Sequence, residues 1–222
     1  YLVSPEITLL SGGLGRVMQY LGRALKKMGL EVVFIEPRYL RKINKATGKE
    51  DPLDYTELTL PLDIPSEAEF TFEITVQGAR EKVLVFKAIN DEGIPVYTYR
   101  DERGFYIQVL FYYVGGSHPT DFQAVEFMTK ASMKLIDCLE EQKRQALEKK
   151  GKGPEWVEPV IALNDGQSVL SAAWRLFWPE LQTDVLLAAH YMVTTHTYRN
   201  RIFGNNREYL LKAGVPEGWM WL

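Results

Sequence analysis

An α/β fold with a doubly wound, mostly parallel sheet is predicted by three features of this 222-residue sequence. A βαβ pattern occupies the first forty residues, and buried strands alternate with helices again in the last third. Between them, residues 55–99 alternate apolar and polar side chains, which is typical of an inserted antiparallel segment. We expect one domain over residues 1–222, because a chain of this length can bury one large core.

The βαβ pattern begins with a short apolar run at residues 1–3 and a glycine-rich loop at residues 11–15. Apolar residues then recur at three- and four-residue steps over residues 14–28, which predicts an amphipathic helix that Gly29 ends. Residues 31–35 are a β-branched run that stops before Pro37, and they predict the second strand.

The remaining elements are predicted from the same kinds of pattern: apolar residues every three to four positions for helices, and alternating apolar and polar residues for strands. Alternation predicts antiparallel strands at residues 56–60, 70–76 and 82–86, and a return to the main sheet at residues 94–99. A helical period runs from residue 121 to about residue 145, and the charged stretch 140–152 is typical of a solvated helix end and linker. The last third predicts a strand at residues 160–163, a helix at 168–177 and a strand at 190–195.

The composition excludes several classes of protein. Apolar residues make up 46% and charged residues 25%, which excludes global disorder. A formal charge of −3 leaves no basic excess to neutralise nucleic-acid phosphates or an anionic membrane. The single cysteine, Cys138, fits a reducing compartment, and no apolar run reaches membrane-spanning length, so we expect a cytoplasmic protein.

Polar loops follow three of the predicted parallel strands, at the edge where ligands bind in open α/β sheets. The first contains Ser11, Gly12, Gly13 and Gly15, whose backbone N–H groups could approach an anionic ligand at a helix N-terminus. A tight turn that packs the helix on the strand would need the same glycines. The spacing is neither that of a P-loop nor that of a dinucleotide fingerprint.

The other two loops also have two interpretations each. Asp165 could cap the following helix, while Gln167 faces the cleft. His196, Tyr198 and Arg199 combine an aromatic ring with hydrogen-bonding groups, a mixture that suits sugar recognition, although a lone histidine is more often structural. The histidines have no ligand spacing and there is no cysteine pair, so no metal site is predicted.

Several segments together resemble the N-terminal half of the glycogen and starch synthases, which are glycosyltransferases of the GT-B fold. They are Ser11-Gly12-Gly13-Leu14-Gly15-Arg16-Val17, Pro37-Arg38-Tyr39, Gly93-Ile94-Pro95-Val96-Tyr97, Asn164-Asp165-Gly166-Gln167, and His196 followed by Leu210-Leu211-Lys212-Ala213-Gly214-Val215-Pro216. The resemblance implies a Rossmann-like, acceptor-side domain of a retaining glucosyltransferase. It also implies transfer of glucose from ADP-glucose or UDP-glucose to an α-1,4-glucan, without a cofactor.

The resemblance assigns roles to particular residues. Asp121, Gln167 and His196 would form the catalytic set that orients hexose hydroxyls. The glycine loop would approach donor phosphate or acceptor sugar, and Asp165, Tyr198 and Arg199 would line the acceptor channel. A covalently linked C-terminal domain, absent from this chain, would bind the donor, so the chain alone is expected to be inactive.

Three departures keep alternatives open. Leu10 and Ser11 stand where the synthases have a lysine before the double glycine, Arg16 stands where the family has an aspartate, and Gln167 takes the position of a cleft histidine. Similar segments occur in the α-glucan phosphorylases, and this alternative would imply pyridoxal phosphate as cofactor. A further alternative is a non-catalytic glucan-binding or regulatory domain. A nicotinamide-dependent enzyme is disfavoured, because Glu36 ends the second strand but the glycine spacing is wrong.

Overall fold

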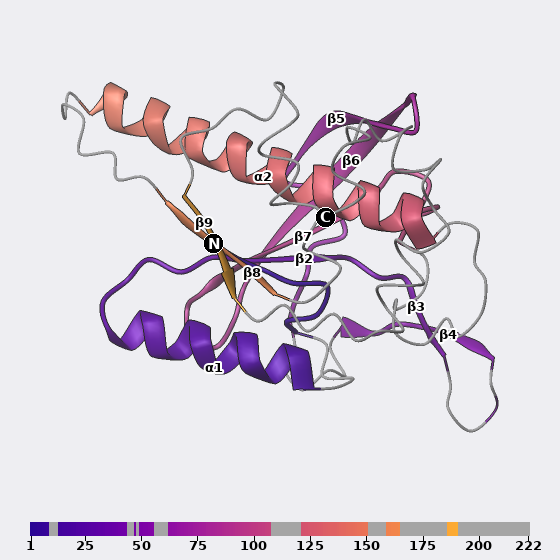
Figure 1. Cartoon of the computed structure of the whole chain (residues 1–222), viewed down its shortest axis with the longest axis horizontal. Helices are drawn as coiled ribbons and strands as arrows, with labels where there is room; N and C mark the ends of the chain where they lie inside the picture. Colours follow the sequence, from indigo (N-terminus) through magenta and orange to yellow (C-terminus); the bar gives the residue numbers. More distant parts are fainter. Residues whose placement is uncertain are drawn as a thin grey trace, which may run out of the picture.

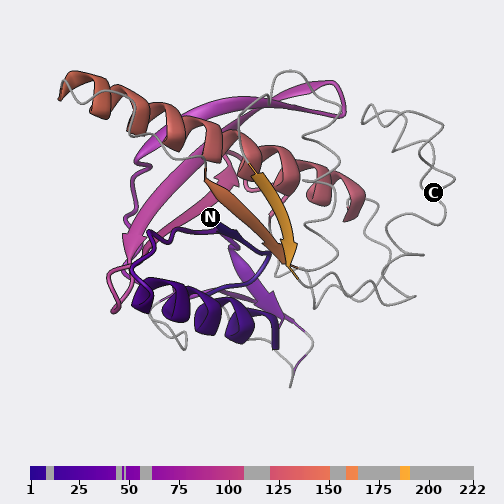
Figure 2. The same cartoon turned by 60° about the vertical axis from the view of Figure 1, so that its left-hand side comes forward.

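The computed structural model describes residues 1–8, 13–43, 47, 49–55, 62–107, 121–150, 159–164 and 186–190. The strands are β1 (Leu2–Val3), β2 (Phe34–Pro37), β3 (Arg41–Ile43), β4 (Glu50–Pro52), β5 (Phe70–Val76), β6 (Ala79–Ile89), β7 (Pro95–Asp101), β8 (Val160–Asn164) and β9 (Leu186–His190). The helices are α1 (Gly13–Lys27) and α2 (Asp121–Lys149). Within the described residues, one main sheet lies between the two helices, as Figures 1 and 2 show.

The main sheet has the strand order β5-β6-β7-β2-β1-β8-β9. The strands from β7 to β9 pair in parallel, whereas β5, β6 and β7 pair as an antiparallel meander. The chain starts in the centre at β1, moves to β2 on one side, and later reaches β8 and β9 on the other. This reversal confirms the predicted doubly wound sheet with an antiparallel segment, and it places a topological switch point beside β1.

Each face of the sheet has its own hydrophobic core. Met18 and Leu21 of α1 pack against Phe34 on one face. Phe127 and Leu135 of α2 pack with Ile35 on the other face. Neighbouring residues of β2 therefore point to opposite cores, as strand geometry requires. Each fully buried side chain of this size contributes about 1.5–3 kcal/mol, so these two cores hold the helices in place.

Helix α1 and the β5–β6 hairpin form where their local sequences predict them. Lys26 and Lys27 lie in the last turn of α1, where cations complement the helix dipole, and Gly29 follows with a φ of 84°. The hairpin turns at Gln77 and Gly78, whose φ angles of 49° and 82° are those of a tight two-residue turn. The predicted strands at residues 70–76 and 82–86 are confirmed, and the second extends over Ala79–Ile89.

Several predicted boundaries were wrong. The second strand is Phe34–Pro37 rather than residues 31–35, because Glu31 is exposed and the parallel pairing with β7 starts at Phe34. The sequence did not predict a strand over Leu186–Ala189, yet β9 begins at Leu186 and pairs in parallel with β8. Residues 191–195 of the predicted strand 190–195 lie outside the described residues. Helix α2 continues to Lys149, so residues 140–149 are helix and not linker.

Other predicted elements have a simpler outcome. The small antiparallel sheet of β3 and β4 was not predicted, because its strands have three residues each and no alternating pattern. The predicted strand at residues 56–60 and the predicted helix at residues 168–177 lie outside the described residues. The return strand is confirmed as β7, which pairs in parallel with β2.

Candidate active site at the carboxyl edge of the sheet

Five parallel strands end at the same edge of the main sheet. Their last residues are Val3, Pro37, Asp101, Asn164 and His190. The segments that carry the predicted site residues leave the sheet at this edge, and Figure 2 shows β8 and β9 side by side as they run toward it. The topology therefore brings together the ends of the strands that precede the three predicted polar loops.

The ends of β1 and β8 are joined by a buried serine. The Ser4 hydroxyl accepts a hydrogen bond from the Nδ2 of Asn164 at 3.2 Å and one from the backbone N–H of Glu6 at 3.3 Å. Ser4 and Asn164 are 2% and 1% exposed, so this contact lies in the interior and not on the rim. The chain entering the glycine loop and the chain entering Asp165 are thus held side by side.

A buried carboxylate on β2 holds the segment that leads into the glycine loop. Glu36 Oε2 accepts hydrogen bonds from the backbone N–H groups of Ile7 at 2.8 Å and Thr8 at 3.1 Å, and the Thr8 hydroxyl donates to Oε1. Burial raises the pKa of Glu36 to about 7, although these three hydrogen bonds favour the carboxylate and lower it. The residue is 0% exposed.

Helix α1 holds the same segment from the other side. The Nε2 of Gln19, a buried residue of α1, donates to the backbone C=O of Ile7. Both backbone polar groups of Ile7 are therefore bonded to side chains, the N–H to Glu36 and the C=O to Gln19. Four residues separate Thr8 from Gly13, where α1 begins.

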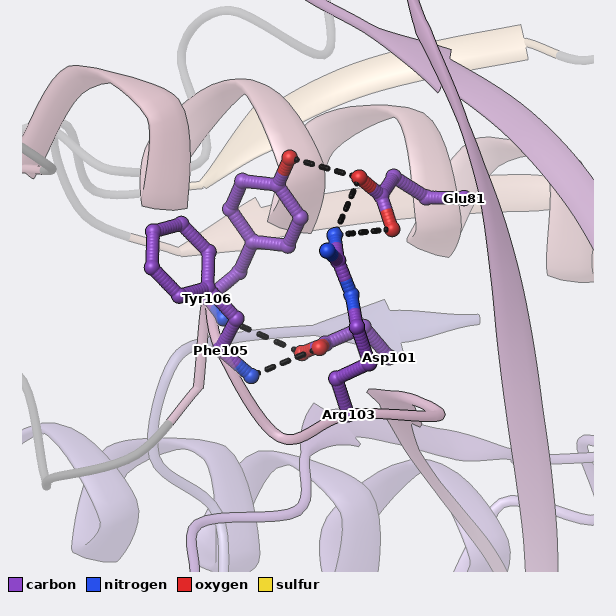
Figure 3. A network of polar contacts seen from close by, with 5 residues as sticks. All are labelled: Glu81, Asp101, Arg103, Phe105 and Tyr106. Atoms are coloured by element: carbon purple, nitrogen blue, oxygen red, sulfur yellow. Dashed lines mark hydrogen bonds and ion pairs between the residues drawn. The ribbon is translucent and has the colours of Figure 1, made fainter.

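The turn after β7 is also fixed by a carboxylate, as Figure 3 shows. Asp101 is 0% exposed and accepts hydrogen bonds from the backbone N–H groups of Phe105 at 2.6 Å and Tyr106 at 3.1 Å. Glu81 of β6 pairs with Arg103 at 2.6 Å and accepts a hydrogen bond from the Tyr106 hydroxyl at 3.1 Å.

The position of Tyr106 is further defined by its aromatic and electrostatic surroundings. Its ring stacks on Phe127 of α2 with a centroid distance of 5.0 Å. Burial, with a smaller effect from the bond to Glu81, raises the pKa of Tyr106 to about 12. The turn that follows β7 is thus held in place as far as Tyr106.

Three of the predicted site residues lie in described elements. Gly13 is the first residue of α1, Gly15 is buried in its first turn, and Asp121 begins α2. The others, Ser11, Gly12, Asp165, Gln167, His196, Tyr198 and Arg199, lie outside the described residues. β9 is described from Leu186 to His190, and the stretch that would join it to His196 lies outside the described residues, so the predicted place of His196 directly after a strand stays a prediction.

Thr8, Gln19 and Glu36 are among the polar residues of this edge that sequence reasoning did not assign to the site. Glu36 was considered only as a ribose ligand, yet its carboxylate bonds the protein's own backbone. One signal could have pointed to it: a glutamate inside an apolar strand of a parallel sheet is covered on both faces, so it needs internal partners. Thr8 and Gln19 carry no comparable local signal.

Over residues 1–8, 13–43 and the other described ranges, no three His, Cys, Asp or Glu side chains are placed to hold a metal ion together. Neither described helix combines the length and the apolar character needed to cross a bilayer. Cys138 is a free thiol on α2, and burial raises its pKa.

The chain was compared with known protein families and structures. The model of the starch synthase catalytic domain family matches residues 1–221. No curated protein sequence matches the chain. Among solved structures, the chain is similar to the catalytic domain of starch synthase IV from Arabidopsis thaliana bound to ADP and acarbose, with 20% identity and a TM-score of 0.53.

That similarity covers 85% of this chain and 33% of the starch synthase IV structure, so the chain spans about a third of the structure it matches. At this identity the structural match shows the fold, and it confirms the predicted N-terminal half of a GT-B enzyme. The family assignment comes from the family model, which extends over almost all 222 residues. The chain therefore belongs to the starch synthase catalytic domain family.

Proposed function

We propose that residues 1–222 form the acceptor-side, N-terminal domain of a retaining glucosyltransferase of the glycogen and starch synthase type. The reaction transfers glucose from ADP-glucose or UDP-glucose to the non-reducing end of an α-1,4-glucan. The observation that carries this proposal is the match of the starch synthase catalytic domain model to residues 1–221. The starch synthase IV structure of similar fold was solved with ADP and acarbose, which supports a nucleotide-sugar donor and a glucan acceptor.

A second, covalently linked Rossmann-like domain would bind most of the donor nucleotide. The share of the starch synthase IV structure that this chain spans, 33%, supports this division. A site built between two domains needs both of them to position donor and acceptor. We therefore expect the 222-residue chain alone to transfer no glucose.

In this proposal the predicted site residues act at the carboxyl edge of the sheet. Backbone N–H groups of the glycine loop, at the N-terminus of α1, would stabilise charge on the donor phosphate as the glycosidic bond breaks. Asp121, Gln167 and His196 would orient hexose hydroxyls, while Asp165, Tyr198 and Arg199 would line the acceptor channel. The polar ends of β1, β7 and β8 described above support this assignment.

A glucosyl-transfer assay tests the proposal. The protein that contains both domains is incubated with glycogen and radiolabelled ADP-glucose or UDP-glucose, and incorporation of label into glycogen is measured. We expect incorporation with at least one donor, and a loss of about a hundredfold in kcat for the Gln167→Ala, His196→Ala double variant. Unchanged turnover in that variant would show that the site assignment is wrong.

Two other results would replace the proposal. Release of glucose 1-phosphate from glycogen in the presence of orthophosphate, together with pyridoxal absorbance, would identify a phosphorylase. Glycogen binding without turnover on either donor would identify a non-catalytic glucan-binding domain.

A further inference from the structure

The Glu36 carboxylate is unusual because it is fully buried and, among the described residues, no cation pairs with it. Burial of an uncompensated carboxylate is costly unless several hydrogen bonds satisfy it. Among the described residues, all of its hydrogen bonds come from one two-residue segment, Ile7–Thr8, which precedes the glycine loop (residues 11–15) in the sequence. The residue therefore fixes the backbone that enters the loop.

The other end of the loop is fixed to the same segment. Gln19 lies on α1, the helix that the glycine loop opens, and it donates to the C=O of Ile7. The start of the loop is thus bonded to β2 through Glu36 and to α1 through Gln19. A displacement of Ile7 relative to either element would break a buried hydrogen bond and leave a polar group unsatisfied, which is unfavourable.

We propose that Glu36, together with Thr8 and Gln19, is a positioning group that sets the geometry of the glycine loop for glucosyl transfer. This inference rests on the proposed function, in which the loop faces the donor phosphate. Glu36 does not touch the substrate; it acts through the backbone of Ile7 and Thr8. Since oriented backbone donors act over short distances, a displacement of about 1 Å can cost up to about a hundredfold in rate.

Two substitutions at Glu36 separate positioning from mere burial. Glu36→Gln keeps one oxygen to accept the two backbone N–H groups, and its amide can donate to the Thr8 hydroxyl. Glu36→Met has a similar volume but leaves both N–H groups without an acceptor. We expect kcat to fall about tenfold or more in Glu36→Met and to stay within about twofold in Glu36→Gln, with the KM for glycogen nearly unchanged in both.

The chain offers a matched control at the opposite edge of the sheet. Asn90, between β6 and β7, is buried and its Oδ1 accepts the backbone N–H groups of Glu92 at 3.1 Å and Ile94 at 2.8 Å. Asn90→Leu therefore leaves two backbone donors unsatisfied, as Glu36→Met does. We expect Asn90→Leu to lower the melting temperature without lowering the kcat of the folded protein.

A second pair of variants guards against misfolding of Glu36→Met. Thr8→Val removes the hydroxyl that donates to Glu36, while Thr8→Ser keeps it. We expect a several-fold fall in kcat for Thr8→Val and near-normal kcat for Thr8→Ser. Amide hydrogen exchange over residues 5–15 provides a readout that needs no activity: it should speed up in Glu36→Met and Thr8→Val, but not in Asn90→Leu.

The outcomes distinguish this inference from the proposed function. Faster exchange over residues 5–15 in a protein that transfers no glucose would support the positioning group and refute the glucosyltransferase. An active protein in which Glu36→Met and Thr8→Val fold and keep full kcat would overturn the positioning role. Equal loss of kcat in Asn90→Leu would also overturn it, because the effect would then reflect general destabilisation.

Discussion

Glu36 and Glu126 are buried to the same degree, at 0% and 1% exposed, but they lie on opposite faces of the sheet and differ in their partners. Glu126 of α2 pairs with Lys130 at 2.8 Å and accepts hydrogen bonds from Gln77 at the β5–β6 turn. Glu36 has three hydrogen-bond donors and, among the described residues, no cation.

The difference shows two uses of a buried carboxylate. With its charge compensated, Glu126 joins a helix to a hairpin, and Lys130 extends the connection to the C=O of Thr75 at 2.5 Å. Among the described residues, the charge of Glu36 is stabilised only by the hydrogen bonds from the backbone of Ile7 and Thr8 and from the Thr8 hydroxyl. The first arrangement stabilises the fold, whereas the second makes the local geometry depend on the state of one carboxyl group.

The largest effect is expected at the compensated pair. Lys130→Met leaves Glu126 as a buried charge without its cation, and we expect it to lower the free energy of unfolding by about 3–5 kcal/mol. Urea unfolding measures the change. The Glu126→Leu, Lys130→Met double variant removes both charges and should recover most of the loss. If Lys130→Met lowers the free energy of unfolding by less than about 1 kcal/mol, the Glu126–Lys130 pair contributes no more than a solvent-exposed ion pair does.

The uncompensated carboxylate should reveal itself in the pH dependence of stability. Burial raises the pKa of Glu36 from 4.5 to about 7, so the folded state binds this proton more tightly than the unfolded state does. Its contribution to stability is present in full below pH 4.5, falls as the pH rises to about 7, and is constant above that.

Glu36→Gln stays neutral throughout and lacks this dependence. We therefore expect the stability of wild type relative to Glu36→Gln to decrease by about 3 kcal/mol between these pH values. Urea unfolding of both proteins at several pH values measures the difference. A difference that does not vary with pH would contradict the assignment of the titration to Glu36.

The sequence predicted some elements of the fold correctly and missed others. The βαβ unit and the hairpin were predicted correctly. Apolar residues recur at a regular spacing both in α1, which has 15 residues, and in the two strands of the hairpin. The strands β3 and β4 were missed because three residues cannot display a period. The start of the last described strand was missed because the alanine and leucine run at Leu186–His190 is equally compatible with a buried helix.

For the candidate site, the sequence predicted an edge of the sheet but not the side-chain contacts at that edge. Topology alone brings the glycine loop, Asp121 and the ends of β8 and β9 to one edge. The contact between Glu36 and Ile7 spans 29 residues and depends on the side-by-side pairing of β1 and β2. No local pattern encodes that distance, so these contacts were visible only in the structure.

A smaller effect is expected from the packing of α1 on β2. A Cβ at Gly22 would overlap the ring of Phe34, which is 1% exposed and cannot move freely. We expect Gly22→Ala to destabilise the fold by about 1–2 kcal/mol, since overpacking outweighs the better helix propensity of alanine.

The same substitution tests the connection to the loop. A shift of α1 would also move Gln19 away from Ile7, so Gly22→Ala should speed amide exchange over residues 5–15. Ala24→Gly is a suitable comparison, because Ala24 is exposed on the same helix and its loss costs only helix propensity. Faster exchange in both variants would indicate fraying of the helix instead of displacement.

The smallest effect is expected at the Arg103–Glu81 ion pair, which is more exposed than the Glu126–Lys130 pair. Arg103 contacts both carboxylate oxygens of Glu81, at 2.6 and 2.7 Å, yet its side chain is 65% exposed against 11% for Lys130. Water therefore screens the pair, and Glu81 keeps the Tyr106 hydroxyl as a donor when Arg103 is removed. We expect Arg103→Ala to lower the free energy of unfolding by less than about 1 kcal/mol, and 0.5 M salt (a Debye length of roughly 4 Å) to reduce this further. A loss above about 2 kcal/mol would mean that contact geometry, and not burial, determines the strength of ion pairs in this fold.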